Sequence, residues 1–245
     1  MSAVRHFLVN VFCAFIPNKP LRKKMRVMLN SDVNGCVRFI KHDLNRKKID
    51  RVNFFVGYQA RSLIIAVNNE YVYKFPLRRN DADKLAVREK RIVDALSKIS
   101  PIHVPGVELL NWNEKIVRKY EHISGVTLSQ MKSDDVINHI DVLAPKIAKF
   151  IYDIACVDPK EIRDLKLSAS ARPGYCLGWY QGDIADNFII DPETFDVVAF
   201  IDWEDARFCD FSWIFTAEKR SPRRELMMAV GTEYDKLYNK NNCKK

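Results

Sequence analysis

The sequence lacks several features that would place it in a specialised class of protein. Its six cysteines are scattered without a CxxC pair, which is not the spacing of a zinc site or of a small disulfide scaffold. There is no internal repeat or low-complexity tract, and glycine is scarce, at 8 of 245 residues. These absences argue against fibrous and disordered chains. We therefore expect a globular protein with reduced thiols, as in the cytoplasm.

The chain also lacks an apolar run that fits a membrane span or a signal peptide. The run "HFLVNVFCAFI" (6–16) covers about half of the ~20 residues that a helix needs to cross a bilayer. Cations follow this run instead of preceding it, and no small-residue cleavage site is evident. These cations are Arg22, Lys23, Lys24 and Arg26. The basic, apolar N-terminal segment is assigned to 1–50. Two interpretations of its first thirty residues remain open: a helix packed on the domain, or an interfacial anchor that meets anionic lipid.

Acidic residues are fewer than basic ones, which gives a net charge of +9. This charge favours anionic partners such as phosphates, nucleic acid or a membrane surface, without choosing among them. No stripe of aromatic residues is interleaved with Arg and Lys, so we expect no nucleic acid. With 245 residues, 47% of them hydrophobic, the chain can bury the core of one large or two small domains.

Hydrophobic periodicity predicts an α+β fold. The runs "RVNFFVG", "SLIIAVNN" and "EYVYKFP" resemble three strands of an antiparallel meander separated by turn residues. A helical pattern follows over 80–99, then two strand-like runs, "GVELLNW" and "KIVRKYE", and another helical stretch over 134–155. Residues 31–50 show no clear period apart from a short helical signal at "VRFIKHDL". Strands followed by a largely helical half indicate two lobes.

A lysine and a glutamate in the first half point to phosphate chemistry. Lys74 stands in the hydrophobic strand "YVYKFP", where a lysine must face solvent or be paired. Glu89 stands on the helix that follows. A strand lysine held by a helix glutamate and directed at the phosphates of a nucleotide is an arrangement that kinases use. The turn "GYQARS", from Gly57 to Ser62, is able to close over phosphates, although a plain hairpin is the better explanation when the turn is taken alone.

The second half carries acidic loops at strand ends. In "QGDIADN", Asp183 occupies the position of a carboxylate that accepts the proton of the acceptor hydroxyl, and Asn187 that of a magnesium ligand. In "VVAFIDWE", an apolar strand leads to Asp202, which is able to bridge Mg²⁺ to phosphates. Glu204 and Asp205 either assist the metal or are solvated.

These motifs, in this order, resemble the aminoglycoside phosphotransferase and choline kinase branch of the protein-kinase-like superfamily over roughly 51–215. The resemblance implies ATP and Mg²⁺ as cofactors, a nucleotide-binding N-lobe (51–122) with a small antiparallel sheet, and a mainly helical catalytic and acceptor-binding C-lobe (123–245). It also implies a hinge whose backbone holds adenine near Lys119, Tyr120 and Glu121, and a helix acid, Asp210, that supports the catalytic loop.

The chain departs from this family in two places. Gln181 replaces the histidine of the catalytic loop, and it can form hydrogen bonds but cannot titrate. Asp183 and Asn187 stand one residue closer together than in the family. Either Asn187 still reaches the metal, or Asp186 replaces it, or the metal site is impaired and the protein is an inactive pseudokinase.

The acceptor is predicted to be a hydroxyl of a small molecule or glycan. Choline, ethanolamine and aminoglycosides are cationic, whereas the segment after Asp202 offers Arg220, Arg223 and Arg224, which either bind an anionic acceptor or form a solvated basic face. We therefore favour an anionic glycolipid or a lipopolysaccharide core sugar, as in related bacterial core-sugar kinases. We expect a cytoplasmic protein, with peripheral contact to the inner face of the bacterial inner membrane if the anchor interpretation holds.

Overall fold

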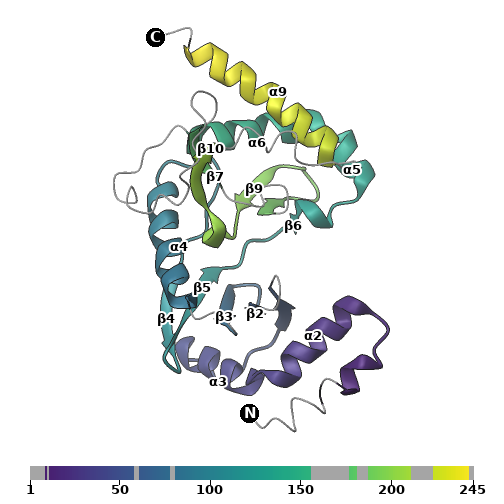
Figure 1. Ribbon diagram of the computed structural model, residues 1–245, viewed down its shortest axis with the longest axis vertical. Helices are drawn as coiled ribbons and strands as arrows, with labels where there is room; N and C mark the ends of the chain where they lie inside the picture. Colours follow the sequence, from purple (N-terminus) through teal and green to yellow (C-terminus); the bar gives the residue numbers. More distant parts are fainter. Residues whose placement is uncertain are drawn as a thin grey trace. The chain divides into compact units, whose positions relative to one another are not determined.

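The structure is a computed structural model that describes residues 9, 11–57, 61–77, 81–155, 177–180, 187–210 and 223–242. The chain forms two compact units (Figure 1). Unit 1 comprises Met1–Val87 and Val107–His122, and unit 2 comprises Arg88–Gly106 and Ile123–Lys245. Among the described helices, none is long and apolar enough to cross a bilayer.

Unit 1 begins with two helices, α2 (Lys19–Asn30) and α3 (Val33–Asp43). The side chain of Asn18 caps α2 by accepting a 2.9 Å hydrogen bond from the N–H of Leu21, and Pro20 stands in the first turn, where its missing N–H is not needed. Asp32 caps α3 in the same way through the N–H of Gly35. The short helical signal at residues 37–44 thus belongs to a longer helix.

A five-stranded antiparallel sheet with the order β1-β2-β3-β5-β4 completes unit 1. The predicted meander and the two later strands are therefore confirmed. In the β4–β5 hairpin, Asn113 and Glu114 both have positive φ, as a type I′ turn requires. The strands are β1 (Val52–Val56), β2 (Ser62–Val67), β3 (Tyr71–Pro76), β4 (Glu108–Trp112) and β5 (Lys115–Glu121).

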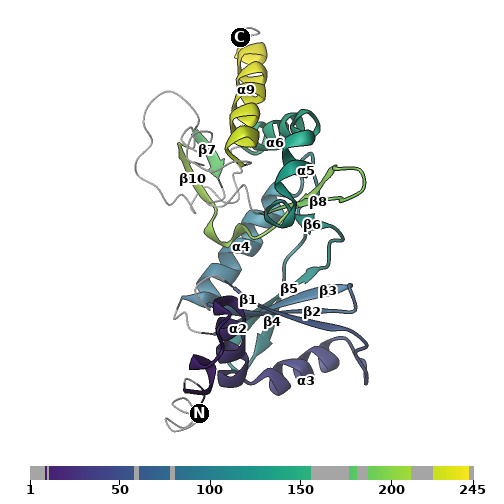
Figure 2. The same ribbon diagram turned by 90° about the vertical axis from the view of Figure 1, so that its right-hand side faces the viewer.

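The core of unit 1 lies between α3 and one face of this sheet (Figure 2). Cys36 and Ile40 of α3 pack against side chains that alternate along β2 and β3. Burial raises the pKa of the Cys36 thiol to about 12, with a contribution from Asp32, so this cysteine remains protonated and unreactive. The sheet residues of the core are Leu63, Ile65, Val67, Tyr73, Phe75 and Val117.

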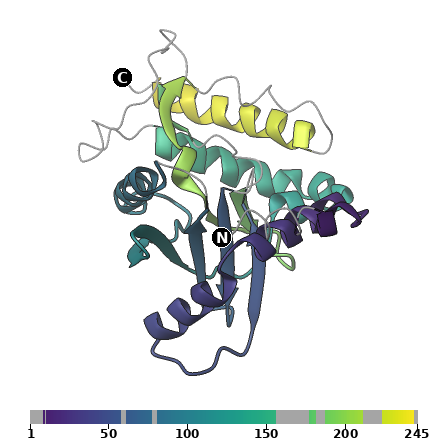
Figure 3. The same ribbon diagram turned by 60° about the horizontal axis from the view of Figure 1, so that its bottom comes forward.

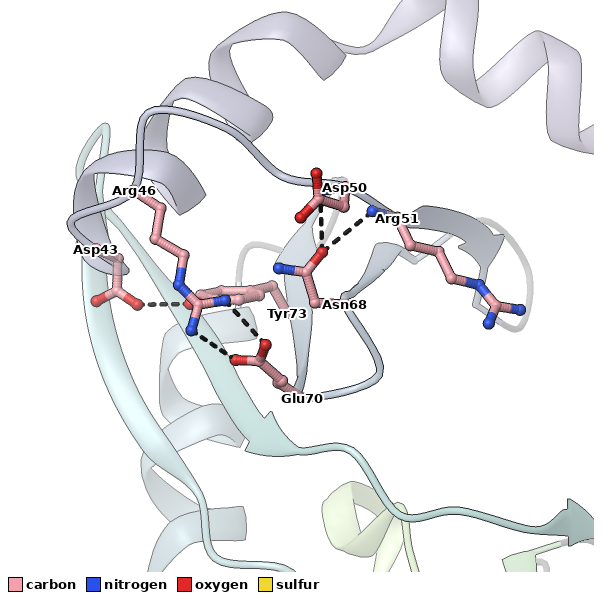
Figure 4. A network of polar contacts seen from close by, with 7 residues as sticks. All are labelled: Asp43, Arg46, Asp50, Arg51, Asn68, Glu70 and Tyr73. Carbon is pink, nitrogen blue, oxygen red and sulfur yellow. Dashed lines mark hydrogen bonds and ion pairs between the residues drawn. The ribbon is translucent and has the colours of Figure 1, made fainter.

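Polar contacts hold α3 and the following connection on the sheet. The Tyr73 hydroxyl donates to Asp43 at 2.6 Å, and the Arg46 guanidinium pairs with Glu70 at 2.9 Å. Burial raises the pKa of Tyr73, and the hydrogen bond to Asp43 raises it further. The backbone N–H groups of Asp50 and Arg51 donate to the side-chain oxygen of Asn68, each at 3.1 Å, so the connection is attached to the sheet as far as β1. Figure 4 shows the network, which consists of Asp43, Arg46, Asp50, Arg51, Asn68, Glu70 and Tyr73.

Helix α4 (Ala82–Leu96) joins the units, because its first residues belong to unit 1 and the rest to unit 2. The predicted helical stretch over 134–155 forms two helices, α5 (Ser133–Asn138) and α6 (Ile140–Ala155). The chain turns at His139, whose ring stacks on Phe195 and whose Nδ1 contacts the carbonyl of Asp135 at 2.8 Å. Pro145 lies inside α6, beyond its first turn.

The rest of unit 2 consists of two small sheets and a C-terminal helix. One sheet has the order β6-β8-β9, and the other pairs β10 with β7. Helix α9 (Arg223–Asn242) lies beside α6 (Figure 3). The rings of Tyr152 on α6 and Tyr234 on α9 pack edge to face, with their centroids 5.7 Å apart. The strands are β6 (Val126–Thr127), β7 (Leu177–Tyr180), β8 (Phe188–Ile190), β9 (Val197–Phe200) and β10 (Arg207–Asp210).

Candidate active site

The β8–β9 hairpin holds the two predicted metal ligands. Phe188 pairs with Phe200, so Asn187 precedes one strand and Asp202 follows the other at the same end of the hairpin. The N–H of Ile201 donates a 3.1 Å hydrogen bond to the carbonyl oxygen of Asn187, which extends the pairing by one residue. The structure therefore places the backbones of Asn187 and Asp202 at the same end of the hairpin.

Asp202 leaves the strand in a conformation that few non-glycine residues adopt. Its φ of 65° and ψ of 64° lie in the left-handed region, which costs on the order of 1 kcal/mol or more. Trp203 then begins the short 3-10 helix η4 (Trp203–Asp205) and is buried against Phe150 and Phe200. The packing of Trp203 maintains the strained turn at Asp202. Strain of this kind concentrates at functional sites.

Arg88 on α4 supports the other side of this turn. Its guanidinium donates to the carbonyl oxygen of Glu204 at 3.4 Å and to that of Ala206. These bonds give partners to carbonyl groups that lie between regular strands. Glu204 and Asp205 are half-buried. The segment after Asp202 is thus held by packing on one side and by hydrogen bonds on the other.

The backbone also places the ends of the predicted catalytic loop. β7 pairs with β10, with Tyr180 opposite Arg207. The segment between Tyr180 and Asn187 therefore begins beside Arg207 and ends beside Ile201. Asp202 lies between these two attachment points along the chain.

The catalytic residue that the sequence predicted falls in this segment. Asp183, with its neighbours Gln181 and Asp186, lies outside the described residues. Asp210 is described by its backbone alone, which pairs with Leu177 at the end of β10. The roles of these residues remain predictions.

In unit 1, three of the predicted nucleotide-binding residues share one face of the sheet. Directly opposed residues in antiparallel strands point to the same face, and neighbours alternate. Lys74 pairs with Ile64 and with Arg118, and Tyr120 pairs with Val72. By this alternation Ser62, Lys74 and Tyr120 lie on the face away from α3. Lys74 is 7% exposed and Ser62 is 3% exposed.

Gly57 lies close to Ser62, across the connection between β1 and β2. The N–H of Gly57 donates a 3.0 Å hydrogen bond to the carbonyl of Ser62, which closes the turn. A Cβ at Gly57 would lie 2.3 Å from the hydroxyl oxygen of Ser62. A side chain at position 57 would therefore require the Ser62 hydroxyl to move, because the nearest backbone atom, the Ser62 carbonyl oxygen, is 3.5 Å away.

Lys119 and Glu121 lie on the opposite face, toward α3. The Lys119 ammonium forms ion pairs with Asp43 at 3.0 Å and Glu108 at 3.1 Å, and it lies over the Tyr71 ring. Burial lowers the pKa of Lys119, but the bonds to Asp43 and Glu108 outweigh it and raise the pKa overall. Glu121 pairs with Tyr71 and is exposed. The side chain of Lys119 therefore belongs to a structural network of the sheet.

Glu89 lies in the apolar stripe of α4. It follows Ala86 by three residues and precedes Val93 by four, so the three side chains share one side of the helix. Glu89 is 1% exposed. A carboxylate is buried to this extent only when a cation or hydrogen-bond donors compensate it.

No known family model matches this chain, and no curated protein matches its sequence. Solved structures do match. The GDP complex of wild-type aminoglycoside 2'-phosphotransferase-IIIa aligns with a TM-score of 0.68 at 15% identity, over 84% of this chain and 83% of that chain. Macrolide 2'-phosphotransferase MphH from Brachybacterium faecium aligns with a TM-score of 0.62 at 12% identity, over 82% of both chains. The streptomycin-ATP complex of APH(2")-IIa aligns with a TM-score of 0.57 at 13% identity, over 84% of both.

The chain has the fold of the aminoglycoside and macrolide phosphotransferases. This result confirms the resemblance, at the level of the fold, and the predicted α+β class. Of the three structures named above, one holds GDP and another holds ATP.

Within this phosphotransferase fold, two residues emerged only from the structure. Arg118 is 4% exposed and stands directly across from Lys74, so two cations are buried side by side on one sheet face. In the strand "KIVRKYE", Arg118 stands two residues before Tyr120, and this spacing places both side chains on the same face of the sheet. The hinge interpretation did not use this spacing. Arg88 had no such signal, because its partners are backbone groups more than a hundred residues away.

The described residues hold no further feature that extends the site. No three His, Cys, Asp or Glu side chains cluster there in a way that could hold a metal ion. A groove of about 580 Å³ in unit 2 is lined by residues such as His103, Lys146 and Asp196, but by none of the predicted site residues. The candidate metal site thus rests on Asn187 and Asp202.

Proposed function

We propose that this protein is a Mg²⁺-dependent phosphotransferase that transfers the terminal phosphoryl group of ATP, or of GTP, to a hydroxyl of a small molecule or glycan. The observation that supports this proposal most directly is the hydrogen bond from Ile201 to Asn187, because it brings Asn187 and Asp202 to one end of the β8–β9 hairpin. The fold shared with named phosphotransferases supports the same reaction class.

The chemistry of this pair fits a magnesium site. Mg²⁺ prefers oxygen ligands, and it usually takes one or two carboxylates together with substrate phosphates. Asp202 offers a carboxylate and Asn187 an amide oxygen. When bound, Mg²⁺ neutralises charge on the transferring phosphoryl group. The strained turn at Asp202, fixed by Trp203 and Arg88, holds the carboxylate in place before the ligand arrives.

Residues of unit 1 are proposed to hold the nucleotide. Lys74 binds phosphate oxygens, and the Gly57–Ser62 turn offers backbone N–H groups and a hydroxyl. Glu89 is proposed to pair with Lys74, since both are buried and of opposite charge. The backbone of residues 119–121 is proposed to hold the base.

Asp183 is proposed to accept the proton of the acceptor hydroxyl as the new O–P bond forms. Gln181 would brace the loop by hydrogen bonds, and Asp210 would support it from β10. The segment that contains Asp183 starts and ends beside the segment that contains Asp202, which supports their joint action.

The favoured acceptor is an anionic glycolipid or a lipopolysaccharide core sugar. Arg224 is exposed in the first turn of α9 and follows Arg223 in the sequence, and Arg220 lies outside the described residues. These cations suit an anionic acceptor. Cationic acceptors such as choline, ethanolamine or an aminoglycoside form the competing class, and a panel that contains members of both classes decides between them.

The decisive experiment measures thermal stabilisation by ATP and GTP with and without Mg²⁺. A ligand at one hundred times its Kd stabilises the folded state by about 2.7 kcal/mol. We expect a magnesium-dependent rise in Tm that Asp202→Asn abolishes. Asp94→Asn, the same chemical change at an exposed site on α4, should retain the rise. Absence of any magnesium-dependent shift in the unmodified protein would contradict the proposal, and nucleotide binding without transfer to any acceptor would favour a pseudokinase.

A further inference from the structure

An apolar cluster is exposed near the N-terminus of the described chain. Ten large hydrophobic side chains are exposed in the described residues, and Val11, Phe12, Phe15 and Leu21 account for four of them. Phe12 is 60% exposed and Phe15 is 83% exposed. The others, such as Ile137 and Met228, are spread along the chain, and isolated exposures of that kind are ordinary. The cluster therefore calls for a partner.

The segment that carries the cluster is ordered by its own contacts. Residues 11–14 are helical, and Cys13 among them is fully buried. The Arg22 guanidinium donates a 2.7 Å hydrogen bond to the carbonyl of Ile16, which fastens the end of this helix to α2. Phe12 and Phe15 are thus exposed on a folded surface, since the segment has already packed through Cys13 and Arg22.

Helix α2 is attached to unit 1 in turn. Val27 is buried, and the Lys23 ammonium donates to the carbonyl of Gly57 at 3.2 Å. This finding favours the first interpretation of the N-terminal segment, a helix packed on the domain. It leaves the anchor interpretation intact, because the apolar cluster stays exposed after the packing.

The charge of the same stretch is one-sided. Residues 11–31 contain five cations and no acidic residue. Lys19, Lys23 and Arg26 follow one another at helical intervals, so they form one exposed face of α2. Exposed aromatic side chains beside a cationic helix face are typical of segments that lie in a membrane interface.

We propose that residues 11–26 form a docking surface for an anionic membrane. Phe12 and Phe15 enter the headgroup region, while Lys19 and Arg26 meet anionic lipid headgroups. A second copy of this chain is a poorer occupant, because it would bring the same cations against one another. The surface does not depend on the proposed phosphotransfer, and its failure would leave that proposal unchanged.

The first test replaces the aromatic side chains in the full chain. The unmodified protein should sediment with vesicles of phosphatidylglycerol and phosphatidylcholine but not with phosphatidylcholine alone, and less so as salt rises. We expect Phe12→Ser with Phe15→Ser to lower partitioning by about tenfold or more, and Phe12→Leu with Phe15→Leu to retain most of it. Ile137→Ser with Met228→Ser, which removes two exposed apolar groups elsewhere, should have no effect.

The second test reverses charge. Lys19→Glu with Arg26→Glu should weaken binding to the anionic vesicles by about tenfold or more. Lys98→Glu with Lys115→Glu alters net charge equally at exposed sites outside the surface, and should have a much smaller effect. Lys23 and Arg22 are left intact because they make structural contacts.

Three results would overturn the proposal. The first is a lack of binding to anionic vesicles by the unmodified protein, and the second is unchanged binding by the Phe12→Ser, Phe15→Ser variant. The third is an equal loss in both charge-reversal pairs, which would assign binding to net charge alone. Sedimentation equilibrium adds a check, since a dimer that the serine variant dissociates, without any vesicle binding, would identify the surface as a self-association site. Circular dichroism confirms that each variant is folded.

Discussion

Lys119 and Asp43 form a 3.0 Å ion pair that joins strand β5 to helix α3. Glu108 on β4 contacts the same ammonium, and the rings of Tyr71 and Tyr73 lie beneath it. Both partners of the pair are largely shielded from solvent. The family resemblance assigned residue 119 to the nucleotide hinge through its backbone, and the side chain has a separate, structural task.

Lys119→Met should therefore destabilise unit 1 without a matching loss of nucleotide affinity. Removing the cation leaves Asp43 shielded and without this partner, which we expect to cost about 1–3 kcal/mol. Urea unfolding measures the change, and the Mg²⁺-nucleotide thermal shift measures affinity. Lys115→Met, at an exposed position on the same strand, serves as the control and should stay within about 0.5 kcal/mol. A large loss of nucleotide affinity at unchanged stability would assign the side chain to the site instead.

Substitutions in the two acidic loops should impair different steps, turnover in one case and metal-dependent nucleotide binding in the other. Asp183→Asn should keep Mg²⁺-ATP affinity within about a few-fold yet lose on the order of 10²-fold or more in turnover, as expected of a positioned general base. Asn187→Ala should lose metal-dependent nucleotide binding, as Asp202→Asn does, if its side chain reaches the metal despite the short loop. Isothermal titration and a phosphate-transfer assay separate the two effects. Unchanged turnover in Asp183→Asn would remove that residue from the mechanism.

Lys74 and Glu89 should behave as a coupled pair. If they interact, Lys74→Met and Glu89→Gln each weaken catalysis, and the double variant loses much less than the product of the two single losses. The measurement is kcat/KM for all four proteins. Fully multiplicative losses would show that the two buried charges act independently.

Gly125→Ala should destabilise the sheet that carries Asn187 and Asp202. Gly125 has a φ of 135°, and a Cβ there would lie 2.7 Å from both the Ile189 side chain and the Ile190 carbonyl oxygen. We expect a loss of about 1–3 kcal/mol in the free energy of unfolding. Gly106→Ala is the matched control, because a Cβ at that position meets nothing within 4 Å. Equal stability of the two variants would contradict the geometry.

Asp191 should make the β8–β9 turn sensitive to acid. Its carboxylate accepts the N–H groups of Glu193 at 2.8 Å and Thr194 at 3.1 Å, and these bonds lower its pKa below the ordinary 3.8. A lowered pKa in the folded state means that the stabilisation is present above 3.8 and is lost as pH falls through the lowered value.

Asp191→Ala should accordingly lower Tm by more at about pH 6 than at about pH 2.5, because protonation of the carboxyl group as pH falls removes the same stabilisation. Thermal unfolding at both pH values checks this prediction. Glu193→Ala alters an exposed side chain of the same turn and should show no such dependence. A Tm difference that is the same at both pH values would rule out the carboxylate as the cause.

Local sequence patterns predicted most of the regular elements. The alternation in β2 and β3 and the helical spacing in α4 follow from burial on one face, which a period of two or 3.6 residues reports directly. The division of 134–155 at His139 was missed, because it depends on stacking of that ring against Phe195 from a distant turn. The extent of α3 was missed for a similar reason, because its apolar side chains pack against strands that come later in the chain.

The sequence by itself determined the candidate residues: Lys74, Glu89, Asp183, Asn187 and Asp202 are recognisable from residue type and order. Tertiary structure alone decided how some of them are held. The register of β8 and β9 brings Asn187 to Asp202, and the packing of Trp203 supports the strained turn between strand and loop. Strand pairing also decided that Lys74 and Lys119 face opposite sides of one sheet. A local sequence pattern cannot predict these features. Hydrogen bonds and side-chain packing between distant segments determine the strand register, the strained conformation at Asp202 and the side of the sheet on which each side chain lies.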